Sequence, residues 1–479
     1  MSEYLSPGVY VEEVPSLVKP IAGVSTSTAA FVGVVPDQLT ILEENPDYDP
    51  TMPAGAANSP TVTWTFPYDQ GAWQAAKAAL AALSQQNSRP PRPLPGSDPK
   101  AYRKARLDFA TADARLSSGT IAPAGVPILC TCFSDFTQSF GGFSTNGLPP
   151  NPPLATGVAA PEGFQNQLAH AVYGFFQNGG TRCYVMRYST LADLRDPEKW
   201  APLEAIDEIS LVAAPGVVDP TGTVQDTMID HCEELTSRFA ILDSPPDPDQ
   251  FTVADLKVPD RNTDYGAIYF PYILVFDMPT QLLNPDGDGR IAIPPSGHIA
   301  GIYSRVDHER GVFKAPANEV IRGALDLGHQ VSRNQQDGLN PYGVNIIRFI
   351  NDNITVWGAR TIGGDANTDL KYINVRRTLI FLRESIDQGT QWAVFEPNDR
   401  SLWAKITRNI TAFLTTVWAD GALFGSTPKE AFYVKCDDET NPPEERDLGK
   451  VTTEIGVAIV RPAEFVIFRI SQWEGPTAS

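Results

Sequence analysis

Cysteine side chains are the first candidates for chemistry in this sequence. Cys130 and Cys132 alternate along an expected strand, which would place both thiols on one face of it. A structural zinc site needs roughly four ligands, but the remaining cysteines, Cys183, Cys232 and Cys436, are scattered along the chain. We therefore expect small buried side chains in a reducing compartment, and no metal site.

Histidine and acidic side chains form three further candidate groups. His231 directly precedes Cys232, and these are the residue types of a Cys–His nucleophilic pair, but neighbours on a helix point in different directions. His298 and His308 lie near charged residues and are of a type used in acid–base catalysis. The turn 286–289, Asp-Gly-Asp-Gly, resembles half of a calcium-binding loop. The other ligands of that loop are absent, so we expect a tight acidic turn.

The glycine motifs that bind nucleotides are missing from the sequence. No stretch matches the phosphate-binding loop GxxxxGK[ST], and none is a convincing dinucleotide fingerprint. We therefore predict no cofactor and no catalytic residue, and we expect that the chain is not an enzyme. The alternative, an enzyme such as a cytoplasmic α/β hydrolase, requires a pocket with converging titratable groups.

The composition argues against nucleic acid and membranes as direct partners. The chain carries 57 acidic and 37 basic residues, and this net charge of -20 repels phosphate backbones and anionic lipids. No apolar run approaches the ~20 residues that span a bilayer, and the N-terminus lacks the pattern of a signal peptide. We expect synthesis and folding in the cytoplasm.

Strand and helix patterns alternate through the middle of the chain. An apolar run at 29–35 predicts a buried strand, and a helix pattern at 162–177 precedes a strand pattern at 181–187. This alternation predicts an α/β fold with several domains. Residues 41–125 differ in composition and include an alanine-rich helix pattern at 71–83, so we expect a surface insert there.

The chain changes character again near residue 340. Helix patterns follow at 372–386 and 402–418, and the second has apolar residues at the spacing of one buried stripe. These patterns divide the chain into an N-terminal arm at 1–22, a middle domain at 23–339 that carries the insert, and a C-terminal domain at 340–479.

A strand pattern at each end of the chain has no neighbour to pair with. Residues 8–14 are cut off by Pro15 and Pro20, and residues 464–470 follow Pro462. Such unpaired backbone groups are commonly satisfied by the sheet of another copy. We therefore predict strand exchange between subunits, with these prolines as hinges. The residues expected to pair are Gly8, Val9, Tyr10, Val11, Glu12 and Val14 at one end, and Phe465, Val466, Ile467, Phe468 and Ile470 at the other.

Short motifs along the chain resemble, in the right order, the signatures of contractile phage tail sheath proteins. The first are SPGVYVEEV at 6–14 and GVSTSTAAFVG at 23–33. The sequence is similar to that family over residues 1–36 and about 160–479, with the insert outside the resemblance. The later motifs are FFQNGG at 175–180, PPSG at 294–297, AGIY at 300–303, GVFKAPAN at 311–318, LNPYG at 339–343, VWGART at 356–361 and YINVRR at 372–377.

The resemblance implies a tail-sheath fold and a structural role. It implies subunits that stack as sixfold rings around an inner tube and contract from a metastable extended state to drive the tube through a target membrane. Expected partners are further copies of the chain, the inner tube protein, the baseplate, and the tail terminator or cap proteins. The C-terminal domain would form the inner surface, where Lys405, Arg408 and Lys429 could meet an acidic tube. The region around His298 and His308 would be structural.

Several assemblies are compatible with this resemblance. A phage tail, a particle released from the cell, and a cell-anchored or cytoplasmic injection system all use such sheaths. Type VI secretion sheaths fit less well, because they are split into two chains. A capsid or tail-tube protein is also disfavoured, since tube proteins are shorter and consist mostly of strands.

Overall fold

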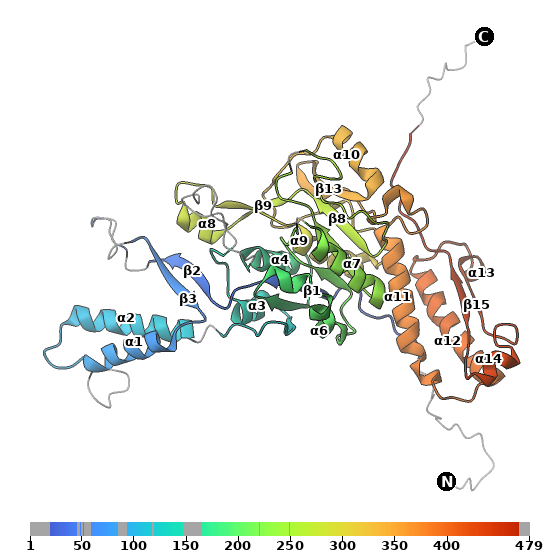
Figure 1. Ribbon diagram of the computed structural model, residues 1–479, viewed down its shortest axis with the longest axis horizontal. Coiled ribbons are helices and arrows are strands. Elements are labelled where there is room, and N and C mark those ends of the chain that lie inside the picture. The colour runs from blue at the N-terminus through green and yellow to red at the C-terminus, as the bar shows by residue number, and fades with distance from the viewer. Residues whose placement is uncertain are drawn as a thin grey trace, which may run out of the picture. The chain divides into compact units, whose positions relative to one another are not determined.

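The computed structural model divides the chain into two compact units (Figure 1). The larger unit comprises Ser25–Ile380 with Arg461–Ser479, and the smaller unit comprises Met1–Val24 with Phe381–Val460. The residues that the structure describes are 20–45, 48, 51, 59–84, 93–116, 119–146, 165–219, 221–248 and 250–468.

A nine-stranded sheet forms the centre of the larger unit. The strands from β5 to β13 in sheet order run parallel, and antiparallel strands complete both edges. Parallel strands that alternate with helices confirm the predicted α/β fold. In sheet order the strands are β11 (Glu319–Val320), β14 (Asn353–Val356), β13 (Val344–Ile350), β8 (Gly266–Phe270), β7 (Phe239–Asp243), β6 (Leu211–Ala213), β1 (Ala29–Val34), β5 (Cys183–Tyr188) and β4 (Ile128–Cys130).

Apolar side chains on both faces of this sheet form two cores. In β1, Phe31 belongs to one core and Val32 to the other, because neighbouring strand residues point to opposite faces. Burial on both faces explains the uninterrupted apolar run of this strand. The first core is completed by α3 (Phe133–Phe140), α4 (Gln165–Gln177) and α9 (Ser296–Arg310), and the second by α5 (Leu191–Leu194), α6 (Ala201–Glu204) and α7 (Thr223–Leu235).

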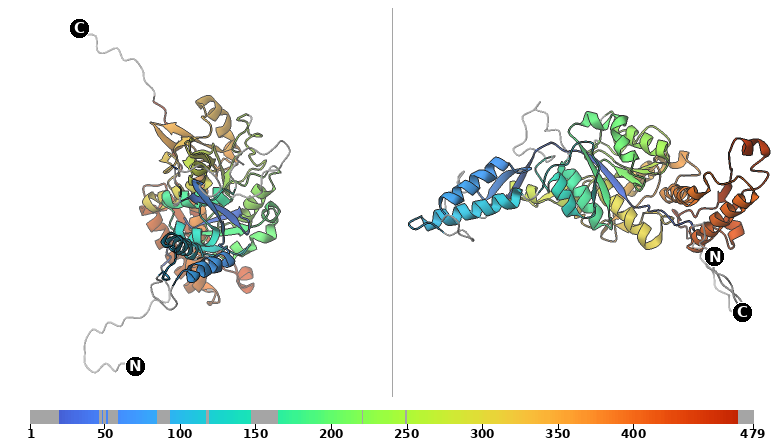
Figure 2. Two further views of the ribbon diagram at one scale, coloured as in Figure 1. Left: turned by 90° about the vertical axis from the view of Figure 1, so that its left-hand side faces the viewer. Right: turned by 90° about the horizontal axis from the view of Figure 1, so that it is seen from below.

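The expected surface insert forms a hairpin and a pair of helices between β1 and β4. Strand β2 (Leu39–Glu44) pairs with β3 (Thr61–Phe66). The alanine-rich helix is confirmed as α1 (Gln70–Ala82), which lies beside α2 (Pro99–Leu116) around a small core of its own (Figure 2). Leu39 and Phe66 of the hairpin are buried in the first core of the main sheet instead. The hairpin therefore belongs to the sheet's core, whereas the two helices have a separate one.

Short elements complete the larger unit. A three-stranded antiparallel sheet contains β10 (Arg290–Ile293), β9 (Ile273–Phe276) and β12 (Asp326–Leu327), and the remaining helices are α8 (Met278–Leu283) and α10 (Arg333–Leu339).

The smaller unit contains helices and a two-stranded sheet. Helix α11 (Ile373–Thr390) begins in the larger unit and ends in the smaller. The predicted apolar stripe of α12 (Arg400–Ala419) is buried at Leu402, Ile406, Ile410, Phe413, Leu414 and Val417, which confirms that it faces a core. The other elements are α13 (Pro428–Ala431), β15 (Phe432–Lys435), α14 (Pro443–Asp447) and β16 (Glu454–Val457). In the described part of the chain, no helix combines the length and apolarity needed to cross a bilayer.

Two expectations differ from the structure. The strand expected around Cys130 and Cys132 ends at Cys130, because the chain turns there into α3; the prediction that both thiols share one strand face is wrong. A domain boundary was also expected at residue 340. In the structure, β13 and β14 beyond that point belong to the nine-stranded sheet, and the division between the compact units comes at Phe381.

Candidate functional site: the bases of the chain ends

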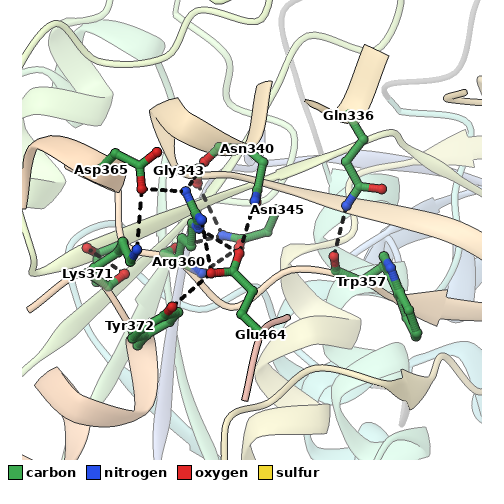
Figure 3. A network of polar contacts seen from close by, with 11 residues as sticks. Gln336, Asn340, Gly343, Asn345, Trp357, Arg360, Asp365, Lys371, Tyr372 and Glu464 are labelled. Atoms are coloured by element: carbon green, nitrogen blue, oxygen red, sulfur yellow. Dashed lines mark hydrogen bonds and ion pairs between the residues drawn. The ribbon is translucent and has the colours of Figure 1, made fainter. Parts of the chain in front are cut away.

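The carboxylate of Glu464 fixes the C-terminal segment to the larger unit (Figure 3). Arg360 holds it with two bonds, from Nε to Oε1 at 2.8 Å and from Nη2 to Oε2 at 2.9 Å. The Tyr372 hydroxyl donates to Oε2 at 2.8 Å, and Asn340 Nδ2 donates to Oε1 at 2.9 Å. A bidentate guanidinium–carboxylate pair with two further donors is a strong, directional anchor.

Arg360 is itself held in place by surrounding polar groups. Its side chain is only 4% exposed, and Nη1 donates to the Asn340 carbonyl at 2.9 Å and to Asp365 Oδ1 at 3.0 Å. Its backbone N–H donates to Asn345 Oδ1 at 2.7 Å. The guanidinium is therefore preorganised to receive Glu464, and Figure 3 shows these groups converging on it.

The electrostatics of this anchor favour a charged carboxylate. Burial alone would raise the pKa of Glu464, but hydrogen bonds from Arg360, Asn340 and Tyr372 outweigh burial and lower it. Burial, together with the bond to Glu464, raises the pKa of Tyr372 to about 12. The ion pair is therefore fully formed at neutral pH.

A second anchor holds the base of the N-terminal segment. Arg377 Nη2 donates to the Thr26 carbonyl at 2.8 Å, and Nη1 donates to Asp307 Oδ1 at 2.9 Å. Asp307 Oδ2 also accepts from the Thr26 hydroxyl at 2.6 Å. The Arg377 guanidinium lies over the Tyr303 ring, 4.7 Å from its centre. In the smaller unit, the Val24 amide donates to Ser385 Oγ of α11 at 3.1 Å.

Both anchors depend on the six-residue segment 372–377. Tyr372 contacts Glu464, and Arg377 contacts Thr26, so the bases of the two chain ends are held at the start of α11. Between them, Asn374 Nδ2 donates to the Phe313 carbonyl at 2.8 Å. The motifs LNPYG, VWGART and YINVRR supply the partners of Glu464, and GVSTSTAAFVG supplies Thr26.

Beyond Glu464 the chain carries an exposed apolar segment. Phe465, Val466, Ile467 and Phe468 are between 68% and 83% exposed, and the described residues 461–468 form no strand within the subunit. A run of four exposed apolar residues costs solvation and typically marks an interaction site. Pro462, the predicted hinge, is half-buried just before the anchor, and Pro20 is exposed. Gly8, Val9, Tyr10, Val11, Glu12, Val14, Pro15 and Ile470 lie outside the described residues.

The smaller unit contains a sheet with open edges. Strands β15 and β16 pair antiparallel from Phe432–Val457 to Lys435–Glu454. Within the described residues this sheet has two strands, so each has one edge without a partner strand. Two-stranded sheets are marginally stable alone and gain from added strands.

Matches to two protein-family models identify the family of this chain. Residues 201–362 match the model for the phage tail sheath protein central domain, and residues 365–472 match the model for the phage tail sheath C-terminal domain. Together these matches cover more than half of the 479 residues. The chain belongs to the phage tail sheath protein family.

Curated members of the sheath family are distant relatives. A putative prophage major tail sheath protein of Pseudomonas aeruginosa is 25% identical over 257 residues, which is 52% of this chain and 62% of that protein. The tail sheath protein of Vibrio phage KVP40 is 27% identical over 180 residues, which is 37% of this chain and 25% of that protein. The chain thus matches less than two thirds of the length of these relatives.

Solved sheath structures have the same fold. The helical sheath of the anti-feeding prophage in its contracted state is 25% identical with a TM-score of 0.61, and 98% of this chain and 99% of that chain are covered. The sheath complex of the PVC extracellular contractile injection system in its contracted state is 24% identical with a TM-score of 0.63 and the same coverage. These matches confirm the predicted tail-sheath fold.

The three cations predicted to meet an inner tube lie in the smaller unit of this sheath chain. Lys405 is half-buried and Arg408 exposed on α12, while Lys429 is exposed on α13. Arg408 borders a shallow groove of about 680 Å³ beside the residues that follow β15. Within the described part of the chain, no acidic side chain forms an ion pair with these three cations.

His231, Cys232 and His298 are all buried in this sheath chain. Burial raises the pKa of Cys232 to about 12, and burial, assisted by Arg238, lowers the pKa of His231 to about 4. His231 Nε2 accepts from Arg238 at 2.8 Å, so it is not available as a base for Cys232. His298 is fully buried, and burial lowers its pKa to about 3. His308 is exposed on α9.

The acidic turn at 286–289 has a structural explanation as well. Asp288 Oδ1 accepts from the Arg290 backbone N–H at 3.2 Å, and Gly289 has a φ of +62°, which favours glycine. This is the tight turn expected from the sequence. Across the described residues, no three histidine, cysteine or acidic side chains converge as metal ligands.

The sequence alone did not predict a site formed by Arg360, Tyr372, Arg377 and Glu464. Glu464 is separated by 104 residues from Arg360 in the chain. The signal was present in the motifs that contain these residues, but a single sequence does not tell which distant residues meet.

Proposed function

We propose that this chain is the subunit of a contractile sheath in a phage tail or a phage-tail-like injection particle. Subunits polymerise as stacked sixfold rings around an inner tube, with a baseplate at one end and a terminator or cap at the other. Contraction from a metastable extended state drives the tube through a target membrane. The observation that carries this proposal is the exposed apolar segment 465–468 directly after the anchor at Glu464.

Strand exchange gives this segment a partner. An incoming strand from a neighbouring copy pairs with an open edge of the β15–β16 sheet, which satisfies backbone groups on both sides. If about five backbone hydrogen bonds form, each contributes roughly 0.5–1.5 kcal/mol, in addition to the burial of the apolar side chains. Because the donor and acceptor surfaces differ, such contacts do not close between two copies and can propagate through a helical assembly.

The two anchors transmit force from each arm to the body of the subunit when a neighbouring copy pulls on that arm. A pull on the N-terminal arm acts on Thr26 and Arg377, and a pull on the C-terminal arm acts on Glu464 and Tyr372. Only residues 372–377 separate these points in the chain, so load can pass from one neighbour to the next through a short segment. Pro20 and Pro462 provide the bends, and the domains then move as rigid bodies between two packings.

The energy for contraction is stored in the assembly. A kinetically trapped extended packing and a contracted packing of lower free energy are sufficient, with the barrier removed at the baseplate end. The sequence carries no phosphate-binding loop, and the proposal requires no nucleotide turnover by the subunit. Lys405, Arg408 and Lys429 contact the acidic surface of the tube from the smaller unit.

A proline substitution in the C-terminal arm tests the proposed strand exchange. Ile467→Pro removes a backbone donor from the middle of the exchanged strand while changing an exposed, irregular segment of the subunit. We expect a folded subunit that forms no long tubes by sedimentation and electron microscopy. Ser471→Pro, just beyond the expected strand, is the matched control and keeps assembly. Normal tubes from Ile467→Pro would contradict exchange through this segment.

A further inference from the structure

Two cysteines face each other across the edge of the nine-stranded sheet. Cys130 of β4 and Cys183 of β5 are partners in an antiparallel register, and both side chains are 0% exposed. Both thiols are free. Burial, together with the neighbouring Cys130 thiol, raises the pKa of the Cys183 thiol well above its ordinary value. Because the two residues are directly opposed in this register, their side chains lie side by side on the same face of the sheet.

The backbone geometry is compatible with a bond between them. Directly opposed residues in an antiparallel pair have Cα atoms about 4.5 or 5.5 Å apart, and their side chains are on the same face of the sheet. Disulfides join Cα atoms about 4.4–6.8 Å apart. The bond can therefore form without a large backbone displacement. Cys232 is also buried and free, but it lies on α7 in the second core.

We propose that Cys130 and Cys183 form a disulfide when the folded chain meets an oxidising medium that contains a small disulfide such as oxidised glutathione. One thiolate first forms a mixed disulfide with half of the glutathione, and the second thiolate then displaces it. Two protons and two electrons leave the protein, and one glutathione disulfide becomes two glutathione thiols. The balance requires no other reactant.

Access to the pair depends on local opening of the sheet edge. Strand β4 contains three residues and lies at the edge of the sheet. Leu129, the residue before Cys130 in this strand, is 40% exposed. Short edge strands open more readily than the sheet interior. The buried, poorly ionised thiols make the reaction slow, so we expect it to take minutes to hours.

The bond would staple the end of the insert to the main sheet. β4 is the first strand after α2, and the cross-link fixes it to β5 beside β1. It closes a loop between residues 130 and 183 and restricts the unfolded chain. We therefore expect an oxidised subunit to have a melting temperature higher by several degrees.

Thiol counting on the full-length protein tests the proposal. The folded protein is treated with reductant or with oxidised glutathione, quenched in acid, denatured, and labelled with a maleimide polymer that shifts its mobility. The sequence has five cysteines, so five labels are expected when reduced and three after oxidation. The exposed Cys132 is the main competitor. Cys132→Ser should go from four labels to two, and Cys183→Ala should keep four in both conditions.

Three results would overturn the proposal. One is retention of five labels after oxidation for a day while the protein stays folded. Another is a loss of two labels on oxidation of the wild-type protein that does not occur in the Cys132→Ser variant. The third is found by mass spectrometry of the oxidised Cys132→Ser protein: a disulfide that joins the peptide 183–187 to any cysteine except Cys130 would contradict the pairing. This measurement also replaces the Cys183→Ala variant if that variant fails to fold.

Discussion

At the residue scale, the anchor at Glu464 fixes the start of the exposed segment 465–468 to the larger unit. The pair with Arg360 is shielded from solvent, since the arginine side chain is 4% exposed and the glutamate side chain 21%. Removing Arg360 would leave the Glu464 charge without a countercharge in a partly buried site, where only Asn340 and Tyr372 of its described partners would still donate to it. The anchor should therefore contribute more than an ordinary surface ion pair.

Replacing Arg360 with methionine should destabilise the subunit and loosen the arm. We expect a loss of roughly 2–3 kcal/mol in the free energy of unfolding, measured with urea. Proteolysis after residue 461 should become faster as well. Arg461→Met is the matched control, because its pair with Asp369 is at 3.9 Å and exposed, and it should cost less than about 0.5 kcal/mol. Equal effects from both variants would show that the anchor is an ordinary surface contact.

Buried histidines predict an acid-sensitive subunit. Burial lowers the pKa of His298 to about 3, whereas an unfolded histidine titrates near 6.5, so its contribution to stability is present above pH 6.5 and falls as the pH decreases. His231 acts in the same direction. Asp243 opposes them, because burial raises its pKa to about 7 and its contribution falls as the pH rises through 7.

His298→Gln isolates one of these contributions. Between pH 7 and pH 5 the wild-type protein should lose on the order of 2 kcal/mol relative to this variant in urea unfolding. The exposed His308→Gln variant should follow the wild-type protein. If the pH dependence of the His298 variant equals that of the wild type, His298 is not neutral in the folded protein.

At the element scale, the sequence predicted individual strands and helices more accurately than it predicted which of them pack together in one domain. The apolar run at 29–35 became β1 and the stripe of 402–418 became the buried face of α12, because both patterns follow the geometry of one element. The pairing of β13 with β8 joins residues 344–346 to residues 268–270, and no local pattern encodes such a distant register. This is why the expected boundary at 340 falls inside the sheet. The anchors at 372–377 were not predicted for the same reason.

Two deletions test whether the helices α1 and α2 of the insert can be removed without destabilising the rest of the subunit. Replacing residues 69–116 with a short Gly-Ser linker removes α1 and α2 together with their own core. The Trp73–Asp113 bond of 3.0 Å shows that the start of α1 lies close to the end of α2. We expect a stable subunit that still assembles, by thermal unfolding and electron microscopy. Deleting 45–120 also removes β3 and exposes Leu39, so it should cost several kcal/mol. Equal stability of the two deletions would contradict this division of the insert.

At the scale of the whole molecule, charge should steer the contact with the tube. The chain has a net charge of -20, and Lys405, Arg408 and Lys429 in the smaller unit form no ion pair within the described residues. The double variant Lys405→Glu and Arg408→Glu should weaken co-assembly with the tube protein at least about tenfold, most strongly at low salt. The same charge change at Lys100 and Arg103 of α2 is the control. A larger effect from the control pair would place the contact elsewhere.

The proposed assembly depends on exchanged arms that link the subunits. Removing residues 1–20 deletes the predicted N-terminal strand but leaves Thr26, Arg377 and the sheet of the larger unit in place. The measurement is negative-stain electron microscopy of this truncated protein and of the full-length protein, each expressed with the tube protein. Strand exchange predicts long tubes of uniform width from the full-length chain and only folded, unassembled subunits from the truncation. Normal tubes from the truncated chain would contradict it.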